Sequence, residues 1–185
     1  MKILVTGAGG MLGTDFVRAA RFWNHDVVAL TRSDLDITDA KAVWETCVRE
    51  QPDVVVNCAA YTNVDAAEDD LVGATRANVD GARNVALGAA EVGAAILYPS
   101  TDYVFDGEKG AAYVESDRTR PLSIYGQTKA TGEAETAAAN QRYYIVRSSW
   151  LFGAAGTNFV DSMLALASKG IKELIVAQKR ALASL

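Results

Sequence analysis

Two residues in the segment YGQTK, Tyr125 and Lys129, have the types and spacing of a proton-transfer pair. On a helix this spacing places both side chains on one face, about 6 Å apart along the axis. A phenol with a pKa of about 10 exchanges protons poorly near neutrality, and a neighbouring ammonium lowers that pKa. The pair could then protonate a carbonyl oxygen that receives hydride. Chance produces this spacing in roughly one chain in four of this composition, so the pair needs supporting context.

A glycine-rich segment, TGAGGMLG, supplies part of that context. Gly7, Gly10 and Gly13 follow a short apolar run and open an amphipathic segment, with Met11 and Leu12 inside the same turn. Glycine permits a tight turn close to a pyrophosphate, and a helix N-terminus offers free N–H groups and a partial positive charge. The motif therefore predicts dinucleotide binding, and the alternative is a packed turn without a ligand.

The end of the second apolar run bears on the choice of dinucleotide. The segment LTRSD places Thr31, Arg32 and Ser33 where an acidic residue would accept ribose hydroxyls, and Asp34 comes one position later. Arg32 could pair with a 2′-phosphate, with the hydroxyls donating to it. We therefore expect NADP(H), with NAD(H) as the alternative; Arg32 as an ordinary exposed loop residue is the other interpretation.

A Ser-Thr step completes the pattern. In PSTDYVFDG (99–107), Ser100 and Thr101 are expected at the carboxyl edge of a sheet, near its switch point. Alone, Ser-Thr-Asp is ordinary turn chemistry. The glycine motif, this step and the Tyr-x-x-x-Lys pair nevertheless occur in the order that a hydride-transfer site needs, so together they predict an oxidoreductase.

The elements that must position these residues alternate along the chain. We expect strands at 2–6, 26–30, 53–57, 94–98, 143–147 and 173–177, and helices at 11–23, 39–50, about 78–92, 123–139 and 158–169. Short runs rich in Val and Ile suit strands buried on both faces. The pattern predicts an α/β fold, a doubly wound parallel sheet (Rossmann-like) with helices on both faces, right-handed connections and the site at the carboxyl ends of the strands.

Composition narrows the function classes. A length of 185 residues suits a single domain, 1–185, and a net charge of −5 with interspersed signs gives no basic patch for nucleic acid. The N-terminus lacks a signal-peptide pattern and no apolar run reaches membrane-spanning length, so a cytoplasmic protein without a membrane partner is expected. One histidine, His25, and two cysteines, Cys47 and Cys58, exclude a His-based zinc site, so we predict no metal.

At this point the sequence resembles the extended short-chain dehydrogenase/reductases, and within them the dTDP-4-dehydrorhamnose reductase family. The match is carried by DLDITD (34–39), NCAAYTNVDAAE (57–68), STDYVFDG (100–107), PLSIYGQTKATGE (121–133) and RSSWLFG (147–153). The resemblance implies NADPH-dependent reduction of the 4-keto group of dTDP-6-deoxy-L-lyxo-4-hexulose to dTDP-L-rhamnose in the cytoplasm.

The resemblance also implies roles for single residues. Tyr125 would be the general acid, Lys129 would lower its pKa and hold the nicotinamide ribose, and Thr101 would bond to the substrate carbonyl. At the cofactor it implies Asp36 and Ile37 beside the adenine and Ala59, Ala60 and Tyr61 along the middle. At the substrate it implies Thr101, Asp102, Tyr103 and Trp150, although Trp150 as a core aromatic is an equal alternative.

The C-terminal segment KELIVAQKRALASL (172–185) departs from the family pattern. After about residue 176 the family's Pro-Thr segment and its smaller substrate-binding lobe are expected to be absent. Because remote binding energy supports orientation at the reacting centre, a chain without that lobe could bind cofactor and turn over little. The alternative function is thus a dinucleotide-binding module or remnant, acting with a partner chain.

An exposed apolar edge left by the missing lobe would favour a homo-oligomer. An epimerase or dehydratase is a weaker variant, because Tyr103 stands where a dehydratase-like site would carry a further acid.

Overall fold

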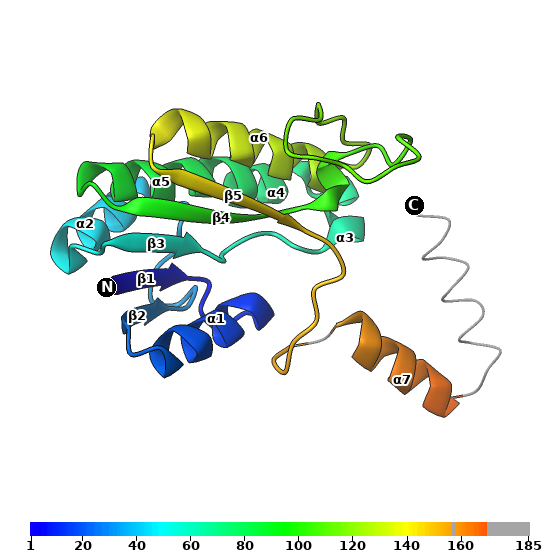
Figure 1. Ribbon diagram of the computed structural model, residues 1–185, viewed down its shortest axis with the longest axis horizontal. Helices are drawn as coiled ribbons and strands as arrows, with labels where there is room; N and C mark the ends of the chain where they lie inside the picture. Colours follow the sequence, from blue (N-terminus) through cyan, green and yellow to red (C-terminus); the bar gives the residue numbers. More distant parts are fainter. Residues whose placement is uncertain (157, 170–185) are drawn as a thin grey trace.

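In residues 1–156 and 158–169, which the computed structural model describes, five parallel strands form one sheet in the order β2-β1-β3-β4-β5 (Figure 1). The strands are β1 (Lys2–Thr6), β2 (Asp26–Leu30), β3 (Val54–Asn57), β4 (Ala95–Thr101) and β5 (Tyr143–Ser148). The second strand, β2, lies on one side of β1, and the later strands β3, β4 and β5 lie on its other side. The switch point of the sheet is therefore between β1 and β3. The predicted parallel Rossmann-like sheet is confirmed, and the sixth strand expected at 173–177 lies outside the described residues.

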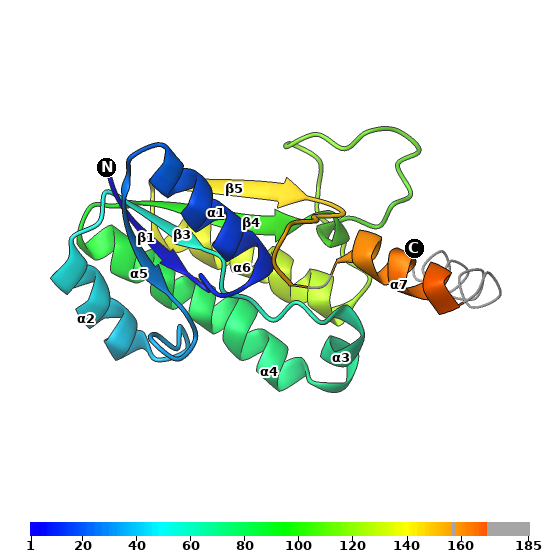
Figure 2. The ribbon, with the colours of Figure 1, turned by 90° about the horizontal axis from the view of Figure 1, so that it is seen from below.

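Helices cover both faces of this sheet. They are α1 (Met11–Phe22), α2 (Ala40–Glu50), α3 (Val64–Asp69), α4 (Leu71–Thr75), α5 (Ala82–Glu91), α6 (Ile124–Ala139) and α7 (Phe159–Lys169), with a π-helical segment η1 (Arg76–Gly81) and a 3-10 turn η2 (Asp102–Val104). Figures 1 and 2 show α1 on one face and α2, α5 and α6 on the other, while α7 lies beyond the carboxyl ends of the strands. The doubly wound arrangement is therefore present, as expected.

Two apolar layers hold the helices to the sheet. Leu4 and Ile96 belong to the layer under α2 and α5, whereas Ile3, Val5 and Val56 belong to the layer under α1. Successive side chains of a strand point to opposite faces, so the continuous Val/Ile/Leu runs feed both layers at once. The strands identified from those runs consequently have both faces buried near the middle of the sheet.

Side-chain caps determine where several helices begin. Asp39 accepts a hydrogen bond from the amide of Ala42 at the start of α2, and Ser123 accepts one from Gly126 at the start of α6. Such caps satisfy amides that lack partners inside the helix. Because Ser123 fixes the first turn of α6, it also sets the position of Tyr125, the second residue of that helix.

Candidate active site

The glycine turn between β1 and α1 is closed by backbone contacts that exclude larger residues. Gly7 has φ +63°, and a Cβ at this position would lie 2.5 Å from the amide nitrogen of Ala59. A Cβ on Gly13 would lie 2.3 Å from the carbonyl oxygen of Gly7, and Gly10 donates to that same oxygen over 3.0 Å. The turn therefore brings the N-terminus of α1 close to the loop that follows β3, which is the geometry needed beside a pyrophosphate.

A cavity of about 950 Å³ opens beside this turn at the carboxyl ends of the strands. Thirteen of the residues singled out from the sequence line it: Gly7, Gly10, Met11, Leu12, Gly13, Arg32, Asp36, Ile37, Ala59, Ala60, Tyr61, Tyr125 and Lys129. The fold thus brings together the predicted cofactor residues and the Tyr-x-x-x-Lys pair. Thr101, Asp102, Tyr103 and Trp150 are not among the residues that line this cavity.

Two buried polar residues at strand ends also line the cavity. Ser100, near the end of β4, lies at the sheet edge where the sequence predicted it, and within the described residues its Oγ has no hydrogen-bond partner. Asn57, the last residue of β3, was not singled out from the sequence. Its Oδ1 accepts a hydrogen bond from Thr6 over 2.7 Å, while its Nδ2 has no partner in the described part of the chain. The position of Asn57 at a strand end could have identified it, since ligands bind at that edge in open α/β sheets.

Further lining residues come from segments without a recognisable motif. Arg76 lies in η1, while Leu151 and Gly156 belong to the segment that follows β5. Cys58 is half-buried beside the cavity, and burial raises the pKa of its thiol to about 11. Cys47 is buried in the core.

Tyr125 lies between residues of η2 and the end of β4. Its ring packs edge to face against Tyr103, with centroids 5.7 Å apart. Burial raises the pKa of Tyr125, the Thr101 side chain lowers it, and Asp102 and Tyr103 raise it. Thr101, Asp102 and Tyr103 therefore lie near the Tyr125 hydroxyl, and Tyr125 connects these three residues with the cavity lining.

The Lys129 ammonium is buried, with 4% of the residue exposed. Its Nζ donates to the carbonyl oxygen of Pro99 over 2.7 Å and lies 4.0 Å from the centre of the Tyr98 ring. Burial lowers the pKa of Lys129 from 10.5 to about 7, while Glu133 and Cys58 act in the opposite direction. The charged form consequently depends on the few groups that surround it.

The segment around Arg32 agrees only partly with expectation. Arg32 is exposed and lines the cavity. The Thr31 hydroxyl, expected to face a 2′-phosphate, instead donates to Asp34 over 2.6 Å and lies 2.8 Å from the Ser33 hydroxyl. Asp34 also accepts from the Thr31 amide, and these bonds lower the pKa of its carboxyl. Asp34 is thus occupied within its own loop, and Arg32 is the one residue of this segment placed at the cavity.

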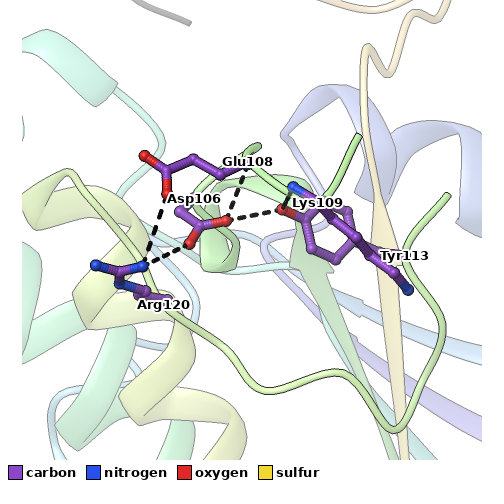
Figure 3. A network of polar contacts seen from close by, with 5 residues as sticks. All are labelled: Asp106, Glu108, Lys109, Tyr113 and Arg120. Carbon is purple, nitrogen blue, oxygen red and sulfur yellow. Dashed lines mark hydrogen bonds and ion pairs between the residues drawn. The ribbon is translucent and has the colours of Figure 1, made fainter. Parts of the chain in front are cut away.

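The connection from η2 to α6 is held by a polar network centred on Asp106 (Figure 3). The Asp106 carboxylate accepts from the Tyr113 hydroxyl over 2.8 Å, from the Glu108 amide over 3.1 Å and from Arg120 over 3.3 Å. The Tyr113 ring stacks on Phe105, with centroids 4.0 Å apart. A long surface loop without secondary structure is thereby ordered next to Tyr103 and the start of α6.

Trp150 lies outside the core. It has φ +53°, is 58% exposed and packs edge to face on Phe159 of α7 at 4.8 Å. The structure therefore rules out the interpretation of Trp150 as a core aromatic. A position beside the sugar remains a proposal for this residue.

Two further observations concern the described part of the chain. None of its helices combines the length and the apolar character that crossing a membrane requires. Within residues 1–156 and 158–169, no three His, Cys, Asp or Glu side chains gather where they could share a metal ion.

Comparison with known proteins identifies the family. The family model described as RmlD substrate binding domain matches residues 1–182. A dTDP-4-dehydrorhamnose reductase of Streptomyces griseus is 44% identical over 174 residues, which are 94% of this chain and 57% of that protein. The spore coat polysaccharide biosynthesis protein SpsK of Bacillus subtilis is 42% identical over 90% of this chain and 59% of its own length.

Solved structures agree in fold. A dTDP-4-dehydrorhamnose reductase of Clostridium acetobutylicum superposes with a TM-score of 0.89 at 44% identity, over 91% of this chain and 60% of that one. The same enzyme of Bacillus anthracis, in complex with NADP, gives 0.88 at 38% identity and the same coverage. The chain spans about 57–60% of the length of these relatives. These matches confirm the resemblance to the dTDP-4-dehydrorhamnose reductases, and the chain belongs to the family of the RmlD substrate binding domain.

Proposed function

We propose that this chain carries the cofactor-binding and proton-transfer half of an NADPH-dependent reductase. The reaction is reduction of the 4-keto group of dTDP-6-deoxy-L-lyxo-4-hexulose to dTDP-L-rhamnose. The observation that carries the proposal is the placement of Tyr125 and Lys129, one helical turn apart, in the cavity that begins at the glycine turn. Membership of the family supports the substrate, since relatives are named for dTDP-4-dehydrorhamnose.

The residues present fit a dinucleotide. The glycine turn leaves no room for side chains beside the α1 N-terminus. Among the residues that the structure describes, Asn57 Nδ2 and Ser100 Oγ at the cavity are buried polar atoms without hydrogen-bond partners. Buried unsatisfied groups are costly, so a polar ligand at this place would stabilise the fold. Arg32 favours the 2′-phosphate of NADP over the free ribose of NAD, and the Bacillus anthracis relative binds NADP.

The chain's own residues then handle the proton and the orientation. The Tyr125 hydroxyl donates its proton to the carbonyl oxygen of the sugar, and its raised pKa keeps it protonated before the step. Thr101 donates a hydrogen bond to the same oxygen, and the Lys129 ammonium stabilises the phenolate that forms and holds the nicotinamide ribose. NADPH, when bound, supplies the hydride.

Turnover of NADPH by the 185-residue chain with dTDP-6-deoxy-L-lyxo-4-hexulose tests this proposal. Tyr125→Phe should reduce kcat by roughly 10² or more while the Kd for NADPH changes little, because general acid catalysis is lost and binding is kept. Tyr144→Phe on the exposed face of β5 is the matched control. Tight NADPH binding without turnover in any of these proteins would instead favour the alternative, a dinucleotide-binding module that needs a partner chain.

A further inference from the structure

A buried ionic cluster lies behind the proposed site, between α6 and β5. Lys129 and Glu133 are four residues apart on α6 and therefore share one face of the helix. The two residues are only 4% and 5% exposed. Two opposite charges buried this deeply on adjacent turns interact through a medium that screens far less than water.

Arg147 on β5 holds the Glu133 carboxylate in place. Its Nε donates to Oε1 over 2.9 Å and its Nη2 donates to Oε2 over 2.6 Å. The guanidinium also lies 5.0 Å from the ring of Phe105. A bidentate pair fixes the position and the orientation of a carboxylate, so Glu133 has no freedom to turn toward solvent.

The other groups that face Lys129 are neutral near pH 7. Cys58 approaches from the loop after β3, and burial raises the pKa of its thiol. Tyr98 on β4 contributes the face of its ring, and burial raises the pKa of its hydroxyl. Tyr125 lies on α6 itself and its pKa is raised as well. Among these groups, in the part of the chain that the structure describes, Glu133 supplies the negative charge.

We propose that Glu133, oriented by Arg147, is a positioning residue that keeps the buried Lys129 ammonium charged and so acts through Lys129 on Tyr125. The effect of Glu133 on catalysis rests on the proposed reductase function, whereas its effect on the charge of Lys129 does not. The Glu133 carboxylate, held in place by Arg147, would serve as a fixed counter-charge one turn behind the amine. The Tyr98 ring and the Pro99 carbonyl complete the surroundings of the ammonium.

The direct test is an NMR titration of the lysine side chains in the 185-residue chain without ligands, with the Lys129 signal identified by its loss in Lys129→Arg. In Glu133→Gln, which keeps the shape of the side chain, the pKa of Lys129 should fall by about one unit, a tenfold loss of the charged form above that pKa. Glu135→Gln is the matched control, since Glu135 lies on the same helix, is 38% exposed and pairs with Arg83 at 3.7 Å. It should leave the titration unchanged.

An unchanged Lys129 titration in Glu133→Gln would overturn the proposal. If this variant fails to fold because Arg147 loses its partner, Glu133→Gln/Arg147→Met removes both charges and is expected to fold. The double variant should also lower the Lys129 pKa, but by less than Glu133→Gln, because the opposing charge of Arg147 is removed as well. A Lys129 pKa that does not fall would again contradict the proposal. The titration needs no turnover, so it distinguishes failure of this inference from failure of the proposed reductase activity. Where turnover is measurable, the pH optimum should move in Glu133→Gln and not in Glu135→Gln.

Discussion

At the scale of single residues, glycine at position 13 is required by the backbone that faces it. An alanine Cβ would lie 2.3 Å from the Gly7 oxygen and 2.8 Å from the Ala8 Cα. Gly13→Ala should therefore lower stability by about 1–3 kcal/mol and weaken NADPH binding, although alanine favours a helix by about 1 kcal/mol. Gly9→Ala is the control, because its Cβ would meet only the Thr31 side chain at 3.4 Å. Urea unfolding and NADPH titration check both; equal effects of the two variants would contradict the argument.

Burial of Lys129 lowers the free energy of unfolding of the protein by an amount that depends on pH. Its pKa in the folded chain, about 7, lies below its ordinary value of 10.5. Between these values the unfolded chain binds more protons, so this residue makes stability rise with pH across that window. Lys129→Met should stabilise the protein by a few kcal/mol near pH 6, with the gain shrinking as pH approaches about 10. Urea unfolding as a function of pH measures the difference, and a gain that stays constant with pH would be inconsistent with a depressed pKa.

At the scale of elements, Asn78 connects three segments around the cavity. Lying in η1, it accepts from the Tyr61 amide over 2.8 Å and donates to the Tyr61 carbonyl and to the Thr128 hydroxyl, each over 3.1 Å. Thr128 directly precedes Lys129 on α6, and Tyr61 lines the cavity. One buried side-chain amide therefore sets the distance between the loop after β3 and α6, which carries the proposed proton-transfer pair.

Asn78→Ala should cost roughly 2–4 kcal/mol and weaken NADPH binding, because it leaves polar groups of Tyr61 and Thr128 without partners. Asn84→Ala serves as the control, since in the described part of the chain the Asn84 side chain makes one hydrogen bond, which it donates to the Ile37 carbonyl over 3.0 Å. Thermal unfolding and NADPH titration are the measurements. A smaller loss for Asn78→Ala than for Asn84→Ala would show that η1 does not organise the loop.

The elements that could be predicted from the sequence are those formed by local pattern. β1 and β2 have the predicted bounds, 2–6 and 26–30, because each is a continuous apolar run. The helical run expected at about 78–92 instead begins at Leu71. Its first part is one short helix, α4, followed by the π-helical segment η1, which is held by contacts such as those of Asn78. Periodicity cannot reveal such contacts.

The residues of the candidate site likewise divide into those that local sequence patterns indicate and those that they do not. The glycine turn and the Tyr-x-x-x-Lys pair could be singled out from the sequence, since their residue types, their spacing and their order along the chain can be read there. Glu133 and Arg147 were not, because 14 residues separate them and only the packing of α6 on β5 brings them together. The network around Asp106 likewise depends on three residues along a loop without periodicity.

At the scale of the whole molecule, several exposed apolar side chains lie in the segment that follows the last strand, β5. Phe152 is 74% exposed and Leu164 on α7 is 65% exposed, and α7 lies apart from the sheet in Figure 1. Exposed apolar surface of this kind favours association. We predict that the 185-residue chain self-associates with rising concentration and that Phe152→Ser/Leu164→Ser reduces this. The control variant Phe22→Ser, at the C-terminal end of α1, should leave the self-association unchanged. Light scattering measures the masses, and a monomer at every concentration would refute the prediction.

The strand order has a consequence for the chain as the ribosome makes it. β1 and β2, the first two strands of the chain, pair with each other, β3 pairs with the free side of β1, and β4 and β5 each pair with the strand that precedes them in the chain. Each strand after β2 can therefore be added at one edge of the sheet, and no strand has to be inserted between two that already pair. The glycine turn and the loop after β3 can thus come together while α6 is still being synthesised, so this part of the cavity can form before Tyr125 and Lys129 join it.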